Sequence, residues 1–391
     1  MNIKRDKITI TGAVLGIASL LFPPITLKPN RVDDGSPLSW LETGGFPLVI
    51  LIILLLLLLL FLGIKSSQNQ YLRTKFFLAF TLFVLVLIFS GPKAGSFLND
   101  SIPYGRITLS SGFWIFLAAL SLILNNMLLY IKKRWLRFLY QALPLLILFI
   151  FIISGGFNSL SLTMEFLLKK ERVITEIGNH LRLAGTAVFL SLCIGIPLGV
   201  LSWKRKKSEK PIFYFLNSVQ TIPSLALFGL LIAPLSYLSF RFPFLREMGI
   251  QGIGNTPALI ALTLYALLPV ARNTYIGLSI VDTDTLQAGQ GMGMGPWQLF
   301  FSVEVPMALP VILSGIRISA IQAVGNTAVA ALIGAGGLGI FIFQGLGQGA
   351  PDLILIGVIP VIALAVLLDR LLSFVFNLSV SPGLILERNN G

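Results

Sequence analysis

Long apolar runs constrain this chain more than any other feature of its sequence. Stretches of about 20 apolar residues recur along the 391 positions, and a helix needs about that length to cross a bilayer. Hydrophobic residues make up 55% of the chain and charged residues only 12%, with a mean hydropathy of +0.88. Because soluble domains carry about twice that charged fraction, the sequence predicts an all-α polytopic membrane protein.

The apolar runs predict about ten transmembrane helices. A charged stretch, 159–179, precedes the sixth of them and is expected to form a separate interfacial helix on the outer face. The expected spans cover residues 8–27, 46–64, 76–92, 111–131, 138–156, 180–203, 211–237, 255–278, 306–333 and 351–376.

The charges between the spans predict the orientation. If Met1 lies in the cytoplasm, the first four segments on that side hold fifteen Lys and Arg residues against two acidic ones. Lys and Arg collect on the cytoplasmic side of membrane proteins, so we expect both termini in the cytoplasm and the protein in the bacterial inner membrane. The basic residues lie at the ends of apolar runs, where they anchor helices, and this placement argues against a nucleic-acid partner.

The composition divides the chain into two regions. Residues 1–156 hold Gly and Pro mostly at helix ends and predict an N-terminal accessory region of five spans. Between residues 157 and 391, Gly and Pro lie inside the spans, as at Pro197, Pro223 and Pro269. Small residues let helices pack closely and prolines free backbone carbonyls, so this second region is predicted to be the working core.

The sequence offers little for metal or cofactor chemistry. Cys193 and His180 are the only residues of their types, which excludes an intrachain disulfide and a Cys/His metal site. We interpret Cys193 as a small buried hydrophobe and His180 as an interfacial residue. Residues 334–339 spell Gly-x-Gly-x-x-Gly without the preceding strand of a dinucleotide site, so a loop or tight helix packing is expected there.

The segment 282–306, between the eighth and ninth spans, is unlike the other loops. It combines several glycines with an apolar helical stretch from Trp297 to Phe301 and closing prolines. An exposed apolar patch of this kind typically awaits a protein partner. Its spacing is Gln287-Ala288-Gly289, three residues, Gly293, nine residues, then Val303-Glu304-Val305-Pro306.

This spacing resembles the coupling loop of the membrane subunits of binding-protein-dependent ABC importers. That loop reads Glu-Ala-Ala, three residues, Gly, nine residues, then Ile-x-Leu-Pro. The chain departs from it at Gln287, which keeps hydrogen-bonding capacity without the charge, and at Gly289, which is expected to weaken the helix by about 1 kcal/mol. The resemblance implies that the ATPase-coupling residues are Gln287, Ala288, Gly289, Gly293, Trp297, Val303, Val305 and Pro306.

Further stretches resemble the osmoprotectant branch of that family, which handles glycine betaine, choline and related quaternary amines. They are 221–224, 262–277, 315–317 and 326–339, and the likeness runs over about residues 175–376. The longer subgroup of this branch carries an N-terminal multi-span extension, as this chain does.

The resemblance implies a type I ABC importer permease core of five helices and a set of partners. These are a cytoplasmic ABC ATPase dimer, a periplasmic or lipid-anchored substrate-binding protein, and a second permease copy or a shorter paralogous permease. The chain has no Gly-x4-Gly-Lys-Ser/Thr pattern. We therefore expect no cofactor in this chain and no enzymatic activity, because ATP and Mg would bind the separate ATPase.

Polar residues inside the core spans have two interpretations. They line the translocation path, or they serve helix–helix hydrogen bonding and aromatic belts. Arg272 and Arg317 are interfacial anchors, or they brace the coupling loop through Asp282 or Asp284. The path candidates are Thr221, Pro223, Ser224, Tyr265, Asn326 and Thr327.

Three other functions compete with that of an osmoprotectant importer. An ABC importer of an amino acid or other small solute remains a possible function, because only the family resemblance indicates which substrate is transported. A secondary transporter usually keeps a membrane-embedded acid or His for ion coupling, and the core spans hold none apart from Asp369 near the far end. A membrane enzyme needs a nucleophile and a base, and no such set is recognisable.

Overall fold

The chain consists of two compact, largely helical units, 1–168 and 169–391, in a computed structural model that describes residues 6–30, 33–65, 71–98 and 105–379. The division between the units falls within a single helix, α8 (Ser161–Lys204). Among the described residues, nine helices are long and apolar enough to cross a membrane. The predicted all-α polytopic membrane fold is confirmed.

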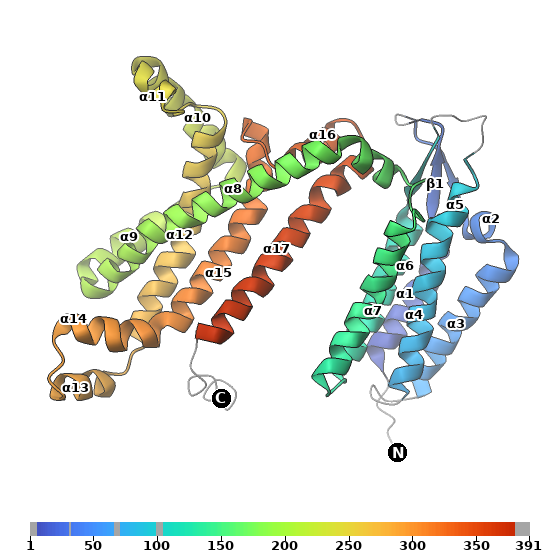
Figure 1. Ribbon diagram of the computed structural model, residues 1–391, viewed down its shortest axis with the longest axis horizontal. Helices are drawn as coiled ribbons and strands as arrows, with labels where there is room; N and C mark the ends of the chain where they lie inside the picture. Colours follow the sequence, from blue (N-terminus) through green and yellow to red (C-terminus); the bar gives the residue numbers. More distant parts are fainter. Residues whose placement is uncertain (1–5, 31–32, 66–70, 99–104, 380–391) are drawn as a thin grey trace. The chain divides into compact units, whose positions relative to one another are not determined.

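The first unit is a bundle built around a short helix, α1 (Lys7–Ser19). This helix packs against α3 (Phe46–Lys65) and α6 (Ser111–Leu129), while α4 (Leu72–Ser90) contacts α6 and α7 (Arg134–Ile153) (Figure 1). An apolar core lies between them. Its most buried side chains include Ile52, Leu56, Leu59, Leu82, Phe116 and Ile123.

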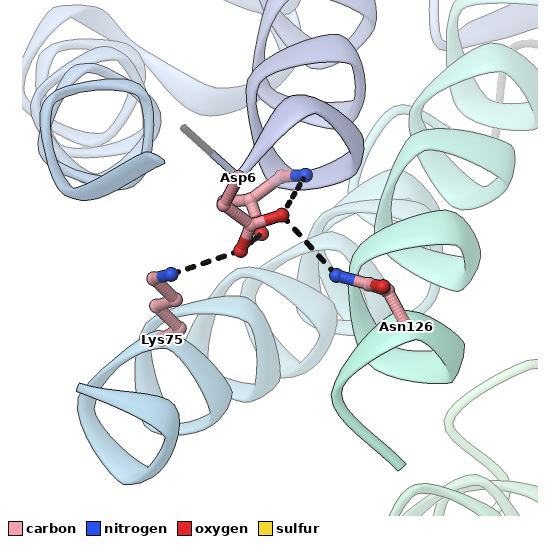
Figure 2. A network of polar contacts seen from close by, with 4 residues as sticks. Asp6, Lys75 and Asn126 are labelled. Carbon is pink, nitrogen blue, oxygen red and sulfur yellow. Dashed lines mark hydrogen bonds and ion pairs between the residues drawn. The ribbon is translucent and has the colours of Figure 1, made fainter. Parts of the chain in front are cut away.

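A buried polar network fixes the start of α1. Asp6 accepts hydrogen bonds from the backbone N–H of Thr9, at 3.2 Å, and from its hydroxyl, at 2.7 Å, which caps the helix. Lys75 of α4 donates to Asp6 at 2.9 Å, and the Asn126 amide of α6 donates at 3.3 Å (Figure 2). The Lys75 and Asp6 side chains are 0% and 1% exposed, so one polar cluster joins three helices inside an otherwise apolar bundle.

The predicted first span, 8–27, is wrong in length. Helix α1 ends at Ser19 after 13 residues, about 20 Å, which is shorter than the roughly 30 Å of a bilayer core. Pro23 and Pro24 then prevent a continuing helix. Beyond them the chain enters a strand, β1 (Ile25–Lys28).

A small antiparallel sheet, which the all-α prediction did not include, lies at one end of the first unit. Its strand order is β2 (Ser36–Leu38), β1, β3 (Arg106–Leu109) (Figure 1). Ile25 pairs with Leu38 on one side and with Leu109 on the other. Two short helices accompany the sheet, α2 (Trp40–Gly44) and α5 (Pro92–Gly95).

The second unit is organised around two long neighbouring helices. They are α12 (Asn255–Ser279) and α15 (Val305–Ala330), which lie side by side along much of their length (Figure 1). The remaining elements are α9 (Lys206–Thr221), α10 (Ser224–Arg241), α11 (Pro243–Glu247), α13 (Thr283–Gly291), α14 (Pro296–Leu299), the π-helical turn η1 (Phe300–Glu304), the 3-10 turn η2 (Ala331–Ile333), α16 (Gly339–Gly347) and α17 (Pro351–Ser379).

Glycines allow this close packing. A Cβ added to Gly315 of α15 would lie 2.6 Å from the carbonyl oxygen of Pro269, and one added to Gly199 of α8 would lie 2.6 Å from that of Ala271. Small residues let helix backbones approach in this way in membrane proteins. Helix α12 is therefore held closely on two sides.

Two expected helices differ from the structure. The charged stretch 159–179 does not form a separate interfacial helix, because it continues without a break into 180–203 as the 44-residue helix α8. The expected span 211–237 is divided into α9 and α10 at Ile222 and Pro223. The residue before a proline is driven to extended backbone, and Ile222 has ψ 127°.

Candidate functional site

The segment 282–306 folds into two short helices joined by a tight turn. Helix α13 ends in a Schellman motif, in which Gly293 N–H donates to the carbonyl of Gln290, at 2.9 Å, and Met294 N–H to that of Gly289, at 3.2 Å. Gly293 takes φ +83°, a conformation that glycine adopts without strain. The glycine of the family pattern thus ends α13 and turns the chain into α14.

Three apolar side chains around this turn are exposed. Met292 is 72%, Trp297 69% and Phe301 62% exposed, and the rings of Trp297 and Phe301 stack with centroids 6.0 Å apart. We name Trp297 and Phe301 together the aromatic surface. Large exposed apolar groups that adjoin in this way are typical of a surface that receives a protein or a membrane.

Residues at the C-terminal end of α8 pack against the aromatic surface and the neighbouring Phe300. The Lys204 ammonium lies 5.1 Å from the centroid of the Trp297 ring and 4.9 Å from that of Phe300. Phe300 is buried and lies 6.1 Å from Trp203, centroid to centroid. Lys204 is one of the basic residues that the sequence predicts on the cytoplasmic side, and no local pattern relates it to rings nearly a hundred residues later.

The remaining residues of the predicted coupling set surround the same turn. Gln287, Ala288 and Pro306 are exposed, whereas Val303 and Val305 are half-buried. Gly289 is buried, and a Cβ added there would lie 2.6 Å from Leu299 Cδ1. The absence of the second Ala of the family pattern therefore makes room for the Leu299 side chain.

Hydrogen bonds from Tyr265 and Gln220 join the break between α9 and α10 to α12. The Tyr265 hydroxyl of α12 donates a hydrogen bond to the carbonyl of Ile222, which the break leaves without a helical partner. The Gln220 amide donates in turn to the carbonyl of Tyr265, at 2.7 Å. Tyr265 is 5% exposed and thus positions the break.

The other path candidates differ in their access to solvent. Thr327 is buried and donates to the carbonyl of Ala323 on its own helix, at 2.7 Å. Thr221 and Pro223 are exposed at the break, and Ser224 and Asn326 are half-buried. The structure therefore joins Tyr265 to the break, while Thr327 serves its own helix.

The two arginines of the core do not brace the coupling loop. Arg317 of α15 forms an ion pair with Asp369 of α17, 2.5 Å from Nε to Oδ1. The Arg272 guanidinium lies over the ring of Phe213, 5.4 Å from its centroid. Of the two interpretations of Arg317, the contact with Asp282 or Asp284 is wrong, because the carboxylate of α17 pairs with its charge.

Two residues of α8 hold the glycine-rich loop 334–338. Glu176 accepts from the backbone N–H of Gly337, at 2.7 Å. His180 is fully buried, with Nε2 2.9 Å from the carbonyl of Val324 and Nδ1 accepting from Leu338 N–H at 3.3 Å. The interpretation of His180 as an interfacial residue is wrong, and so is that of Cys193 as a buried hydrophobe, because the Cys193 side chain is exposed. Glu176 and His180 are one helical turn apart and share a face.

Replacing Gly337 by Ala is expected to lower the melting temperature of the purified chain. Gly337 has φ +81°, and an added Cβ would lie 3.1 Å from His180 Nδ1, so the variant loses about 1–3 kcal/mol. Gly229→Ala in α10 is the matched control, because its added Cβ meets nothing within 4 Å. Equal melting temperatures for both variants would contradict a structural role for this loop.

Comparison with known proteins now connects these features to a family. Residues 191–378 match the family described as "Binding-protein-dependent transport system inner membrane component", and residues 4–163 match "ABC transporter permease YehY, N-terminal domain". The carnitine transport permease protein OpuCB of Listeria monocytogenes is 41% identical over 50% of this chain and 83% of its own length. The chain belongs to the family of binding-protein-dependent transport permeases.

Other permeases of known cargo are similar to the same extent. The osmoprotectant import permease protein OsmW of Salmonella typhimurium is 41% identical over 54% of this permease and 93% of its own length. The glycine betaine/carnitine/choline permease OpuCB of Bacillus subtilis is 39% identical over 51% and 85%. The resemblance recognised in the sequence is confirmed, and the chain is a multi-pass membrane permease of an ABC importer.

Proposed function

We propose that this permease is the transmembrane subunit of an ATP-driven importer for a compatible solute. The cargo class is a quaternary amine such as glycine betaine, choline or carnitine, as the names of the similar permeases suggest. The proposal that ATP hydrolysis in a separate subunit drives transport is supported chiefly by the aromatic surface. This surface is exposed on the turn whose sequence resembles the family's coupling loop.

The aromatic surface would dock into a groove of a cytoplasmic ABC ATPase dimer that binds ATP and Mg. Aromatic anchors of this kind supply most of the affinity of protein interfaces. A periplasmic or lipid-anchored binding protein would deliver the solute, and a second permease copy or a shorter paralogous permease would complete the pathway. The permease itself would catalyse no reaction, and it would lie in the inner membrane with both termini in the cytoplasm.

The break between α9 and α10 is the proposed lining of the translocation path. Thr221 and Pro223 are exposed there and Ser224 is half-buried, next to carbonyls that the break frees from helical bonding. Asn326 of α15 is a further candidate. A path without charged groups would bind a quaternary cation weakly, so selectivity would reside in the binding protein.

A secondary transporter is less well supported. The acid that such a mechanism would need, Asp369, is engaged by Arg317. His180 is buried and bonded to the backbone at both ring nitrogens. Neither group is therefore placed to take up and release an ion during transport.

Uptake by the reconstituted complex tests the proposal. The permease is incorporated into proteoliposomes with the ATPase and the binding protein encoded beside it, and labelled glycine betaine is supplied outside with ATP inside. Uptake should require ATP and should be competed by choline or carnitine. Uptake without ATP would favour a secondary transporter. Competition by an amino acid, but not by quaternary amines, would move the cargo to that class.

A further inference from the structure

A cavity of about 680 Å³ opens on the first unit between α6 and α7, next to the start of α1. Its aliphatic wall contains Ile8, Leu122 and Leu129. Five polar side chains also line it, and none of the residues lining it is acidic. They are Ser121, Asn125, Asn126, Arg137 and Gln141.

Asn126 contributes a buried acceptor to this cavity. Its amide nitrogen donates to Asp6, while its carbonyl oxygen has no hydrogen-bond partner among the described residues. Figure 2 shows that this oxygen is turned away from Asp6. The side chain is only 5% exposed. A buried acceptor without a partner is destabilising, so a donor brought by a bound molecule would satisfy it.

Among the described residues that line the cavity, Arg137 is the only cation. It donates one N–H to the carbonyl of Ile131, at 3.1 Å. A guanidinium has five such donors, so this bond leaves most of them for an anion. Because the lining contains no carboxylate, the cavity favours a molecule with negative charge.

Exposed amides on the two helices point to a headgroup. Asn125 and Gln141 are exposed on helices that are apolar enough to span a membrane. Asn125 donates to the carbonyl of Ser121 on its own helix, at 2.9 Å, so Gln141 is the amide left for a headgroup. Polar side chains on such surfaces are rare. The two amides lie in the last turns of α6 and the first turns of α7, where a bilayer places its headgroups.

We propose that this cavity binds one anionic glycerophospholipid of the phosphatidylglycerol class. The phosphodiester accepts hydrogen bonds from Arg137 and Gln141, and a hydroxyl of the glycerol headgroup donates to the carbonyl oxygen of Asn126. One acyl chain lies along Ile8, Leu122 and Leu129. Charge complementarity selects this class, because a zwitterionic headgroup would place a cation near Arg137.

Lipid retention by the full-length permease tests the proposal. The purified chain is titrated in detergent with dioleoyl-phosphatidylglycerol, -ethanolamine or -choline, or with free glycerol 3-phosphate, and bound molecules are counted by native mass spectrometry. Phosphatidylglycerol should be retained about fivefold more tightly than the zwitterionic lipids. Arg137→Gln should remove this preference. Gln141→Leu, at an exposed position that folding does not require, should weaken retention about two- to tenfold.

Arg205→Gln is the matched control, because Arg205 is equally an exposed arginine but lies in the second unit. It should retain phosphatidylglycerol like the unchanged permease. Equal retention of anionic and zwitterionic lipids would overturn the proposal, as would unchanged retention in both cavity variants. Binding of glycerol 3-phosphate as tight as that of the lipid would assign the cavity to a soluble phosphate ester and equally overturn it.

Discussion

Replacing Trp297 and Phe301 by Ala should uncouple the permease from its ATPase while the membrane fold persists. Exposed aromatic residues at the centre of an interface cost about 2–4 kcal/mol each when truncated, which weakens association about 30- to 700-fold per residue. Both side chains are more than half exposed and support no core, so folding should not suffer. The measurement is the affinity of the purified ATPase for nanodisc-embedded permease, together with ATP-driven uptake.

Phe138→Ala provides the control for this experiment. Phe138 is 71% exposed on α7 of the first unit, so its truncation removes one ring of comparable exposure from the other unit. Gly293→Ala tests the backbone shape of the turn without removing an aromatic side chain. A side chain is strained at φ +83°, although nothing lies within 4 Å of the added Cβ. If the double aromatic variant bound the ATPase as tightly as Phe138→Ala does, the proposed coupling role would be wrong.

Apolar runs in the sequence predicted most spans closely because length and composition act locally. The expected spans 46–64 and 255–278 correspond to α3 and α12, within one residue at each end. The first span failed because the run of apolar residues continued past the helix, whereas two prolines and strand pairing ended it at Ser19. A hydropathy pattern contains no information about that pairing.

The missed contacts all join residues that are distant in sequence. The Glu176 carboxylate meets Gly337 across 161 positions, and Arg317 meets Asp369 across 52. Likewise, the β1–β3 pairing joins short segments whose composition is not distinctive. The coupling-loop pattern could be recognised because its spacing is local. The support from Lys204 could not, because it depends on how α8 packs in three dimensions.

Replacing Lys75 by Met should strongly destabilise the first unit. The change leaves the buried Asp6 carboxylate without its cationic partner, and breaking a buried ion pair from one side costs about 3–5 kcal/mol. The double variant Asp6→Asn/Lys75→Met should recover most of the loss, since Asn can still cap α1. Hydrogen exchange of the α1 amides in detergent measures the effect. Lys65→Met, at the exposed end of α3, is the control and should change little.

The pH dependence of the hydrogen-exchange protection of the α1 amides should also reflect the Asp6–Lys75 ion pair. Burial opposes ionisation of Asp6, but hydrogen bonds from Lys75 and Thr9 outweigh it and hold the pKa of this carboxyl below its usual value. Because the folded pKa is the lower one, the stabilisation is complete above the unfolded pKa of about 3.9 and is lost as pH falls through the folded pKa. Protection, corrected for intrinsic exchange, should therefore stay constant between about pH 5 and 8.

In Lys75→Met, burial would no longer be outweighed by the lysine, and the pKa of Asp6 should rise. Burial then holds the folded pKa above the unfolded value of about 3.9, so the native state takes up the proton more readily than the unfolded chain. Residual protection of α1, corrected for intrinsic exchange, should therefore increase as pH falls through the folded pKa, whereas the unchanged permease loses protection at low pH. If acidification lowered α1 protection alike in both proteins, the Lys75 ammonium would not be what keeps Asp6 ionised. The buried pair would then have no part in fixing the start of α1.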